Sequence, residues 1–226
     1  NIVVLTGAGI SAESGLKTFR DANGLWEGHD VLEVASPEGF YRNPELVLDF
    51  YNQRRRQLLS VHPNEAHKAL VSLERQFNVN IITQNVDDLH ERAGSSQVLH
   101  LHGELLKARS TAVPEDIFEC RKDILLGHYC KNGHQIRPHI VWFGESVPML
   151  DEAIQIIKTA DIVIIIGTSM QVYPAASLIN FAQLETTIYF IDPNPTINHS
   201  EFKNLTVMST TAVEGVPTLV ASLIGK

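Results

Sequence analysis

A short apolar run that ends in a glycine-rich turn constrains the fold of this chain more than any other feature. Residues 2–5 are Ile-Val-Val-Leu, and Thr6-Gly7-Ala8-Gly9 follow. An uninterrupted aliphatic run of this kind is typical of a parallel strand buried on both faces. The glycines let the backbone turn sharply towards a pyrophosphate, and we expect Ser11 to open a helix whose free N–H groups favour an anion. The pattern predicts a nucleotide-binding α/β fold, but it also fits a tight turn without a ligand.

The residues after Gly9 depart from an ordinary dinucleotide-binding unit. Such a unit continues with a helix, a second strand and an acidic residue about 20 positions on that binds the ribose. Residues 17–26 are instead polar, contain glycine and lack periodicity. We interpret them as a loop over the nucleotide that carries Phe19 and Arg20, which argues for chemistry other than hydride transfer.

Composition limits the classes of function. The chain has 226 residues, of which 44% are hydrophobic, enough for one main domain with a small insert. Its net charge of −8 argues against specific nucleic-acid binding, and no apolar run is long enough to span a membrane. Two cysteines, Cys120 and Cys130, favour a reducing compartment, either a bacterial cytoplasm or one such as the mitochondrial matrix.

Helix and strand signals alternate along the rest of the chain. We expect helices over residues 44–61, 63–77, 150–160 and 175–184 and from about residue 216, and strands over residues 79–83, 98–101, 140–142, 162–166, 187–192 and 205–208. Residues 108–137 have no clear period, so we interpret them as an inserted segment. The alternation predicts an α/β fold with a mostly parallel sheet and helices on both faces.

Polar residues follow three of the predicted strands. Carboxyl ends of parallel strands line the crevice in which open α/β sheets bind ligands. The residues at these three ends are Gln84, Asn85 and Asp87, then His102, and finally Gly167, Thr168 and Ser169.

Two of these residues have a structural alternative. Histidine titrates near neutral pH, so His102 can act as a general base on a ribose hydroxyl, although a lone histidine is more often structural. Asp87 or Asp88 could cap the helix that follows, and we assign the cap to Asp88.

Tyr51 and Arg54 share a face of the helix predicted over residues 44–61, because they are three residues apart. Arg55 and Arg56 point elsewhere. Taken alone, the pair fits a solvated basic face with a half-buried tyrosine.

With these motifs in register, the chain resembles the sirtuins, a family of NAD-dependent protein-lysine deacylases, over essentially its full length. The motifs in the family's order and spacing are Gly7-Ala8-Gly9-Ile10-Ser11, Thr18-Phe19-Arg20, Gln84-Asn85-Val86-Asp87, His102-Gly103, Val141-Trp142-Phe143-Gly144-Glu145 and Gly167-Thr168-Ser169. The resemblance implies one catalytic domain over residues 1–226. It would have a Rossmann-type large lobe (about 1–30, 62–107 and 138–226) and a small lobe (about 31–61 and 108–137).

The resemblance also implies roles for the motif residues. NAD would be a consumed co-substrate, and acylated lysines of proteins would be the partners. Residues implied to contact NAD are Gly7, Ala8, Gly9, Ser11, Phe19, Arg20, Trp26, Gln84, Asn85, Asp87, Gly167, Thr168, Ser169, Asp192 and a loop at Ala212. Val141, Trp142, Phe143, Gly144 and Glu145 would hold the substrate peptide as an added strand.

The implied chemistry needs three residues, His102, Asn85 and Asp87. The acyl oxygen attacks ribose C1′ as nicotinamide leaves, and His102 then accepts a proton through the ribose hydroxyls. Asn85 and Asp87 line the nicotinamide and ribose pocket.

Tyr51 and Arg54 match the signature of the sirtuin branch that removes succinyl and malonyl groups. Arginine can bind a carboxylate with two hydrogen bonds, and a phenol adds a third. The resemblance therefore implies that this enzyme prefers acidic acyl chains and retains some deacetylation.

The chain departs from the sirtuin pattern at the structural zinc site. Many sirtuins use two Cys-x-x-Cys pairs, whereas this chain has only Cys120 and Cys130. A mixed set with His128 and His134 is chemically feasible but has no recognised spacing. We therefore expect no zinc site of the usual kind.

Two other functions remain open at this stage. Mono-ADP-ribosyl transfer would use the same site with another nucleophile, and a non-enzymatic NAD-responsive module would bind without turnover. His102, Asn85 and Asp87 together favour an enzyme over the module. The missing second strand and ribose acid argue against a dehydrogenase.

Overall fold

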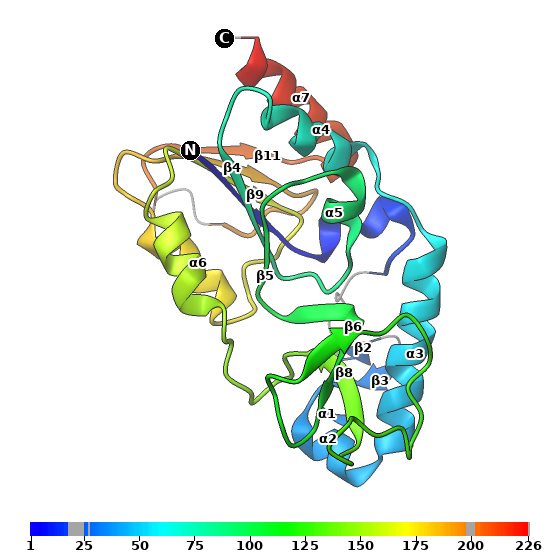
Figure 1. The fold of residues 1–226 in the computed structure, drawn as a ribbon. Helices are drawn as coiled ribbons and strands as arrows, with labels where there is room; N and C mark the ends of the chain where they lie inside the picture. The colour runs from blue at the N-terminus through cyan, green and yellow to red at the C-terminus, as the bar shows by residue number, and fades with distance from the viewer. Residues whose placement is uncertain (18–24, 27, 198–201, 226) are drawn as a thin grey trace.

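A six-stranded parallel sheet forms the centre of the molecule (Figure 1). The computed structural model describes residues 1–17, 25–26, 28–197 and 202–225. The strand order is β11-β10-β9-β1-β4-β5, and every neighbouring pair is parallel. The strands are β1 (Ile2–Thr6), β4 (Val79–Thr83), β5 (Val98–His100), β9 (Ile162–Ile166), β10 (Thr187–Ile191) and β11 (Leu205–Met208). The predicted Rossmann-type sheet is confirmed.

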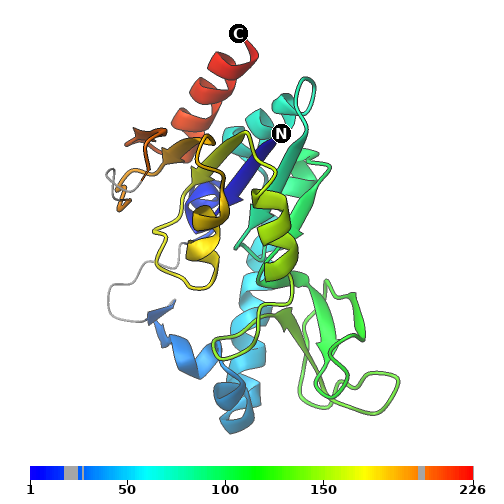
Figure 2. The ribbon, with the colours of Figure 1, turned by 90° about the vertical axis from the view of Figure 1, so that its left-hand side faces the viewer.

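Alternate residues of β1 face two separate hydrophobic cores. Ile2 and Val4 pack with α4 (Glu65–Leu73) and α7 (Ala212–Ile224). Val3 and Leu5 face the opposite core, which contains residues of α6 (Leu150–Ile157) and of the 3₁₀ helix η3 (Ala175–Phe181). Figure 2 shows α6 in front of the sheet, on the face away from α4. Because both faces are covered, the strand carries no polar alternation.

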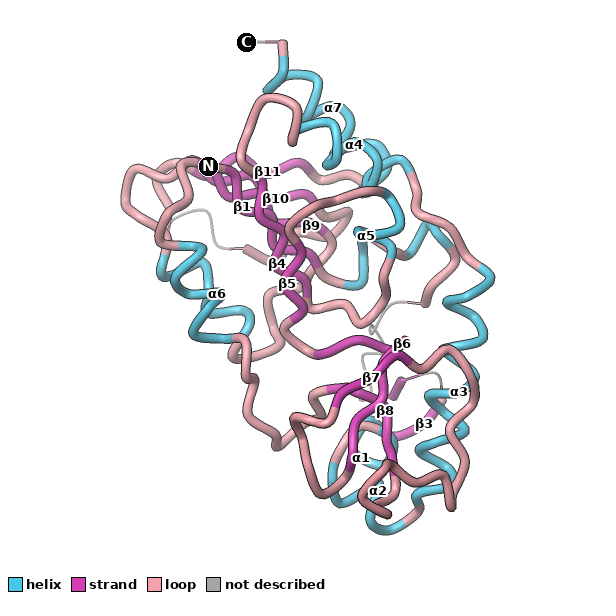
Figure 3. The backbone as a smooth tube through the Cα atoms, in the orientation of Figure 1, coloured by secondary structure: helices cyan, strands magenta, loops and turns pink. Residues whose placement is uncertain are grey.

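The second part of the molecule combines helices with a small antiparallel sheet (Figure 3). Its sheet has the order β7-β6-β8. Its elements are β2 (Leu25–Trp26), β3 (His29–Asp30), α1 (Val31–Val34), α2 (Pro37–Arg42), α3 (Pro44–Ser60), β6 (Gly103–Ser110), β7 (Ile117–Glu119) and β8 (Ile136–Ile140). The boundaries proposed for the two lobes stay a prediction.

Several predicted elements have different bounds or types in the structure. The strand expected at 140–142 lies earlier, as β8, and residues 108–137 contain β7, the last three residues of β6 and the first two of β8. Buried and partly exposed residues alternate along β6, so no long apolar run marks it in the sequence. The helix expected over 175–184 is the 3₁₀ helix η3, and α7 begins at Ala212 with Pro217 inside it. The predicted start near residue 216 was wrong. Proline is common in the first turn of a helix, which suggested a start beside Pro217, but here the helix begins one turn earlier.

Buried polar contacts tie α3 to the loop at residues 120–127. The Asn52 side chain donates to the Ile124 carbonyl and accepts from the Ile124 N–H, both at 2.9 Å. Arg55, which is fully buried, donates to Asn52 Oδ1 at 2.7 Å and to the Leu105 carbonyl at 3.1 Å. Arg55 thus serves the interior of this part of the molecule, a role that the sequence did not predict.

Two buried histidines lie side by side near the end of β1. The ring centroids of His67 and His90 are 4.9 Å apart, and His90 Nε2 lies 3.1 Å from Thr6 Oγ1. Burial lowers the pKa of His67 to about 4 and lowers that of His90 well below its usual value. Both rings are therefore neutral in the folded protein at neutral pH.

We expect His67 to make the fold sensitive to acid. The unfolded chain takes up a proton on this ring near pH 6.5, while the folded chain takes it up only near pH 4. The free energy of unfolding should therefore be highest above pH 6.5 and fall as the pH drops to about 4. For a pKa shift of this size the loss is roughly 3 kcal/mol. Urea unfolding at several pH values should show a shallower acid loss in His67→Gln, since glutamine can keep the helix cap that His67 makes with Asn64. His62→Gln, at an exposed position, is the control; an equal slope in wild type and His67→Gln would contradict the assignment.

Among the described residues, no helix combines the length and the hydrophobicity that crossing a bilayer requires.

Candidate active site

A cavity of about 910 Å³ lies at the carboxyl ends of the parallel strands. The strand order reverses between β1 and β9, and the loops that follow both strands line the cavity. Ligands bind at such a point in open α/β sheets. The predicted site residues that line it are Gly7, Ala8, Gly9, Ser11, Trp26, Tyr51, Arg54, Gln84, Asn85, Asp87, His102, Val141, Trp142, Phe143, Gly144, Glu145, Gly167, Thr168 and Ser169.

Four predicted site residues are not among the lining residues. Phe19 and Arg20 lie outside the described residues. Asp192 is buried, and its carboxylate accepts from the Asn194 N–H at 2.8 Å, while Asn194 itself lines the cavity. Ala212 is not in a loop, as we expected, because it is the first residue of α7 and its side chain is buried in the core.

The glycine-rich turn packs against the end of β9. The Gly9 N–H donates to the Gly167 carbonyl at 2.8 Å, and a Cβ on Gly9 would lie 2.5 Å from the Gly167 Cα. A Cβ on Gly7 would lie 2.7 Å from the Thr168 Cβ. These contacts require glycine at both positions whether or not a ligand is bound.

Ser11 opens a helix, as expected, but this is one short 3₁₀ turn and not an α-helix. Two 3₁₀ turns, η1 (Ala8–Ile10) and η2 (Ala12–Ser14), follow β1. The Ile10 and Ser11 N–H groups donate to the Gly7 and Ala8 carbonyls, both at 3.1 Å. The amides of Gly7 and Gly9 also have acceptors within the chain. These four amides are therefore committed to the turn itself.

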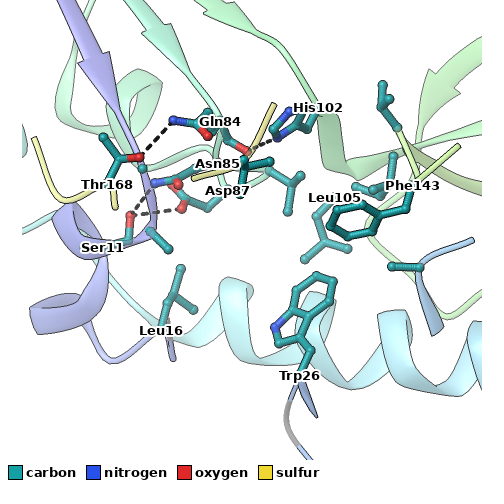
Figure 4. Close-up of a pocket in the computed structure, with 18 of the residues that line it drawn as sticks. Ser11, Leu16, Trp26, Gln84, Asn85, Asp87, His102, Leu105, Phe143 and Thr168 are labelled. Atoms are coloured by element: carbon teal, nitrogen blue, oxygen red, sulfur yellow. Dashed lines mark hydrogen bonds between the residues drawn. The ribbon is translucent and has the colours of Figure 1, made fainter. Parts of the chain in front are cut away.

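The Ser11 side chain instead organises the polar floor of the cavity (Figure 4). Its hydroxyl donates to Asp87 Oδ2 at 2.9 Å and accepts from Asn85 Nδ2 at 3.3 Å. Gln84 Nε2 donates to Thr168 Oγ1 at 3.2 Å, which connects the ends of β4 and β9. The network holds five of the predicted site residues in fixed orientations.

Asp87 also makes the helix-start contact that we had assigned to Asp88. Asp87 Oδ1 accepts from the Leu89 N–H at 3.1 Å, whereas the Asp88 side chain pairs with Arg92. The assignment to Asp88 was wrong because the Asp87 carboxylate accepts from the N–H two residues later, as in an Asx turn. Sequence spacing alone does not distinguish such a turn from a helix cap. Burial raises the pKa of Asp87 to about 6, against the opposing hydrogen bonds from Leu89 and Ser11. The carboxylate is therefore mostly ionised at pH 7.

His102 is held in the tautomer that a general base needs. Its Nδ1 lies 3.0 Å from the Gln84 carbonyl oxygen. A carbonyl can only accept, so Nδ1 carries the hydrogen and Nε2 keeps its lone pair. Burial lowers the pKa of His102, so the ring is neutral at pH 7. Gly103 follows with a φ of +80°, and a Cβ there would lie 2.1 Å from the His139 carbonyl oxygen, which accounts for the His-Gly pair.

His100, which we had not selected from the sequence, supports the neighbouring peptide. Its Nδ1 donates to the Asn85 carbonyl at 3.1 Å, and its Nε2 donates to Glu91 at 2.6 Å. Burial alone would lower the pKa of His100, but the Glu91 carboxylate raises it overall. His102 thus holds Gln84 and His100 holds Asn85, each through a backbone carbonyl. The spacing of His100 and His102 on one polar strand end was the only sequence signal for this arrangement.

Glu91, His100 and Glu104 form the one group among the described residues whose ligand atoms are close enough for a metal ion. Lys107 pairs with Glu104 at 2.6 Å, so each carboxylate already has a cationic partner. We interpret the group as a balanced set of ion pairs.

The candidate mixed zinc ligands are not gathered in this way among the described residues. Cys120 and Cys130 pack beside a small apolar cluster that includes Ile124 and Ile136. Cys130 Sγ contacts the Ser110 hydroxyl at 3.5 Å.

Tyr51 and Arg54 border the cavity from α3. Tyr51 is fully buried, and its hydroxyl accepts a hydrogen bond from Trp142 Nε1 at 2.9 Å. The Arg54 guanidinium stacks 3.2 Å from the Phe50 ring centroid, and its Nη1 donates to the Phe50 carbonyl. The alternative was a solvated basic face with a half-buried tyrosine. It does not fit Tyr51, because this side chain has no exposed surface.

The segment 141–145 forms another wall of the cavity. The amides of Val141 and Phe143 donate to the His102 and Ala35 carbonyls, both at 2.9 Å. The amide of Trp142 donates to the Glu145 carboxylate, and that of Glu145 donates to the Trp142 carbonyl. A peptide strand added here would therefore rely mainly on the carbonyl groups of the segment.

Sequence reasoning missed part of the lining. Some of these residues are apolar positions that a core would use equally well, others lie in loops without a motif, and Gln57 lies on α3 outside the Tyr51 and Arg54 pair. They include Leu16, Ala35, Gln57, Leu105, Val147, Tyr173, Asn194 and Thr196.

Comparisons with known proteins agree with the geometry of this site. The model of the Sir2 family matches residues 7–174. An NAD-dependent protein deacylase of Helicobacter pylori is 59% identical over 224 residues, which cover 99% of this chain and 97% of the relative. A solved Sir2 homologue in complex with NAD is 41% identical with a TM-score of 0.90, covering 99% of this chain and 89% of that one. A Sir2 mutant solved with a p53 peptide and NAD is 31% identical with a TM-score of 0.80, covering 99% and 93%.

Proposed function

The chain belongs to the Sir2 family, and from this premise we propose that it removes succinyl and malonyl groups from protein lysines in preference to acetyl groups. It is an NAD-dependent protein deacylase, as its relatives are named. The products would be nicotinamide, O-acyl-ADP-ribose and free lysine. The observation that carries the preference is that Tyr51 and Arg54 border the same cavity as His102.

The residues present fit NAD. The cavity of about 910 Å³ falls within the usual size of small-molecule sites. Its polar floor offers amide, carboxylate and hydroxyl groups from Asn85, Asp87 and Ser11, and these complement a carboxamide and ribose hydroxyls. When bound, NAD supplies a ribose carbon that becomes electrophilic as its bond to nicotinamide breaks.

The protein's own contribution to the reaction is to orient groups and to accept a proton. Asn85 and Asp87 are fixed by Ser11, so they meet the ribose and nicotinamide end without reorganising. His102 keeps Nε2 as the free base, because its Nδ1 is committed to the Gln84 carbonyl.

Two groups near the cavity complement an acidic acyl end. The Arg54 guanidinium carries five N–H donors, of which Nη1 already serves the Phe50 carbonyl. Tyr51 adds a neutral phenol, because burial raises its pKa. A carboxylate between them would gain charge-assisted hydrogen bonds that an acetyl group cannot make.

An acyl-lysine panel with the wild-type enzyme tests the proposal. We expect kcat/KM for succinyl-lysine peptide to exceed that for butyryl-lysine, which has the same chain length without the carboxylate, by about 10- to 100-fold. The kcat/KM for acetyl-lysine peptide should be close to that for butyryl-lysine and below that for succinyl-lysine. Equal values for succinyl and butyryl peptides would refute the preference.

Mass spectrometry of the same reactions tests the reaction class. Nicotinamide and O-acyl-ADP-ribose should appear together. ADP-ribosylated protein alone would instead support mono-ADP-ribosyl transfer, and unchanged NAD would support a binding module.

A further inference from the structure

A buried hydrogen bond links Trp142 to Tyr51. Trp142 is 2% exposed and Tyr51 0% exposed, and the indole Nε1 lies 2.9 Å from the phenolic oxygen. The two residues come from different parts of the chain, 91 positions apart. Water has no access to replace this contact.

The chemistry of the two groups fixes the direction of one hydrogen. An indole N–H can only donate, so the Tyr51 oxygen is the acceptor. The phenolic hydrogen must then point away from Trp142. Burial raises the pKa of Tyr51, so the phenol keeps this hydrogen at neutral pH. Tyr51 is one of the cavity-lining residues although it has no exposed surface, so a bound group reaches this hydrogen only when the cavity wall shifts to admit it.

Trp142 is itself held rigidly by an ion pair. The Arg137 guanidinium stacks 3.4 Å from the indole centroid and binds both oxygens of Glu145 at 2.9 Å. Glu145 Oε2 also accepts from the Trp142 backbone N–H at 2.8 Å. Arg109 adds a second cation on Glu145 at 3.0 Å. The indole is therefore fixed on one face by Arg137 and at its backbone by Glu145.

We infer that Trp142, clamped by Arg137 and Glu145, is a positioning residue for acidic-acyl selectivity, because it directs the Tyr51 hydroxyl hydrogen towards the acyl carboxylate. This inference rests on the proposed function and goes beyond the Tyr51 and Arg54 pair. Without the indole N–H, the phenolic hydrogen can rotate towards any other acceptor, and the donor is no longer preorganised. Acyl groups without a carboxylate gain nothing from this arrangement.

The test is a double-mutant cycle read as a selectivity ratio. The ratio is kcat/KM for succinyl-lysine divided by kcat/KM for butyryl-lysine, so general losses of turnover cancel. Trp142→Phe removes the N–H but keeps an aromatic ring. We expect it to lower the ratio by about tenfold in the wild-type background and by less than about twofold in Tyr51→Phe. Benzothienylalanine at position 142, which keeps the indole shape without the N–H, replaces Trp142→Phe if thermal melting shows that the latter does not fold.

Phe40→Leu is the matched control. Phe40 packs against the same indole, with ring centroids 5.3 Å apart, and it has no part in the hydrogen bond. We expect its selectivity ratio to stay within about twofold of wild type.

Two results would overturn the inference, and they are distinguishable. The first is that Tyr51→Phe lowers the selectivity ratio, but Trp142→Phe lowers it equally in both backgrounds or in neither. This result overturns the role of Trp142 alone. A normal ratio in Tyr51→Phe overturns both this inference and the proposed role of Tyr51.

Discussion

Replacing His102 with alanine should lower kcat by about 10²- to 10⁴-fold, the usual contribution of a positioned general base. NAD should still bind, because the polar floor built by Ser11, Asn85 and Asp87 does not depend on the imidazole. Steady-state deacylation measures the loss, and calorimetric titration with NAD measures the binding.

A second substitution separates proton transfer from support of the backbone. His102→Asn can still donate an N–H to the Gln84 carbonyl, as Nδ1 does in the wild type, but it has no Nε2 base. We expect it to be as inactive as His102→Ala. His139→Ala, a half-buried histidine outside the cavity lining, serves as the control. Near-normal turnover in His102→Asn would mean that His102 acts only through Gln84.

Arg54→Met should remove most of the preference for acidic acyl groups. Charge-assisted hydrogen bonds to a carboxylate contribute about 1.5–3 kcal/mol, so kcat/KM for succinyl-lysine should fall by about 10- to 100-fold. Methionine can still pack on the Phe50 ring, where the guanidinium lies at 3.2 Å. Deacetylation should change far less, because the acetyl group carries no charge.

Arg56→Met provides the matched control for Arg54→Met. Arg56 lies on the same helix and has the same charge, but its side chain is 54% exposed and pairs with Asp123. Its substitution should leave the succinyl-to-acetyl ratio near the wild-type value. Equal kcat/KM for succinyl-lysine in wild type and Arg54→Met would rule out the carboxylate-binding role.

The elements of the parallel sheet were the most predictable part of the fold. The strands at residues 79–83, 162–166 and 205–208 were confirmed with the predicted bounds. Strands with both faces covered carry apolar residues at nearly every position, which makes them visible in the sequence. The antiparallel strand β8 was misplaced because its sequence, Ile-Arg-Pro-His-Ile, contains no apolar run, although four of its five residues are buried.

The candidate site was predictable where a motif ends a strand, and less so where contacts cross the chain. Gln84, Asn85, Asp87 and His102 all line the cavity, as their positions after parallel strands predicted. The contact of Asp87 with Leu89 and the support of Asn85 by His100 depend on side-chain directions that spacing does not specify.

The parallel sheet, the family and the residues with the right chemistry were all visible in local patterns, because buried strands and polar strand ends have characteristic residues. How those residues act depends on contacts that form on folding. Folding packs Gly9 against Gly167, sets the tautomer of His102 through Gln84 and places the Trp142 indole on the Tyr51 hydroxyl. Each of these contacts joins residues that are separated in the chain. Which group donates and which accepts is settled only when folding brings the two partners together.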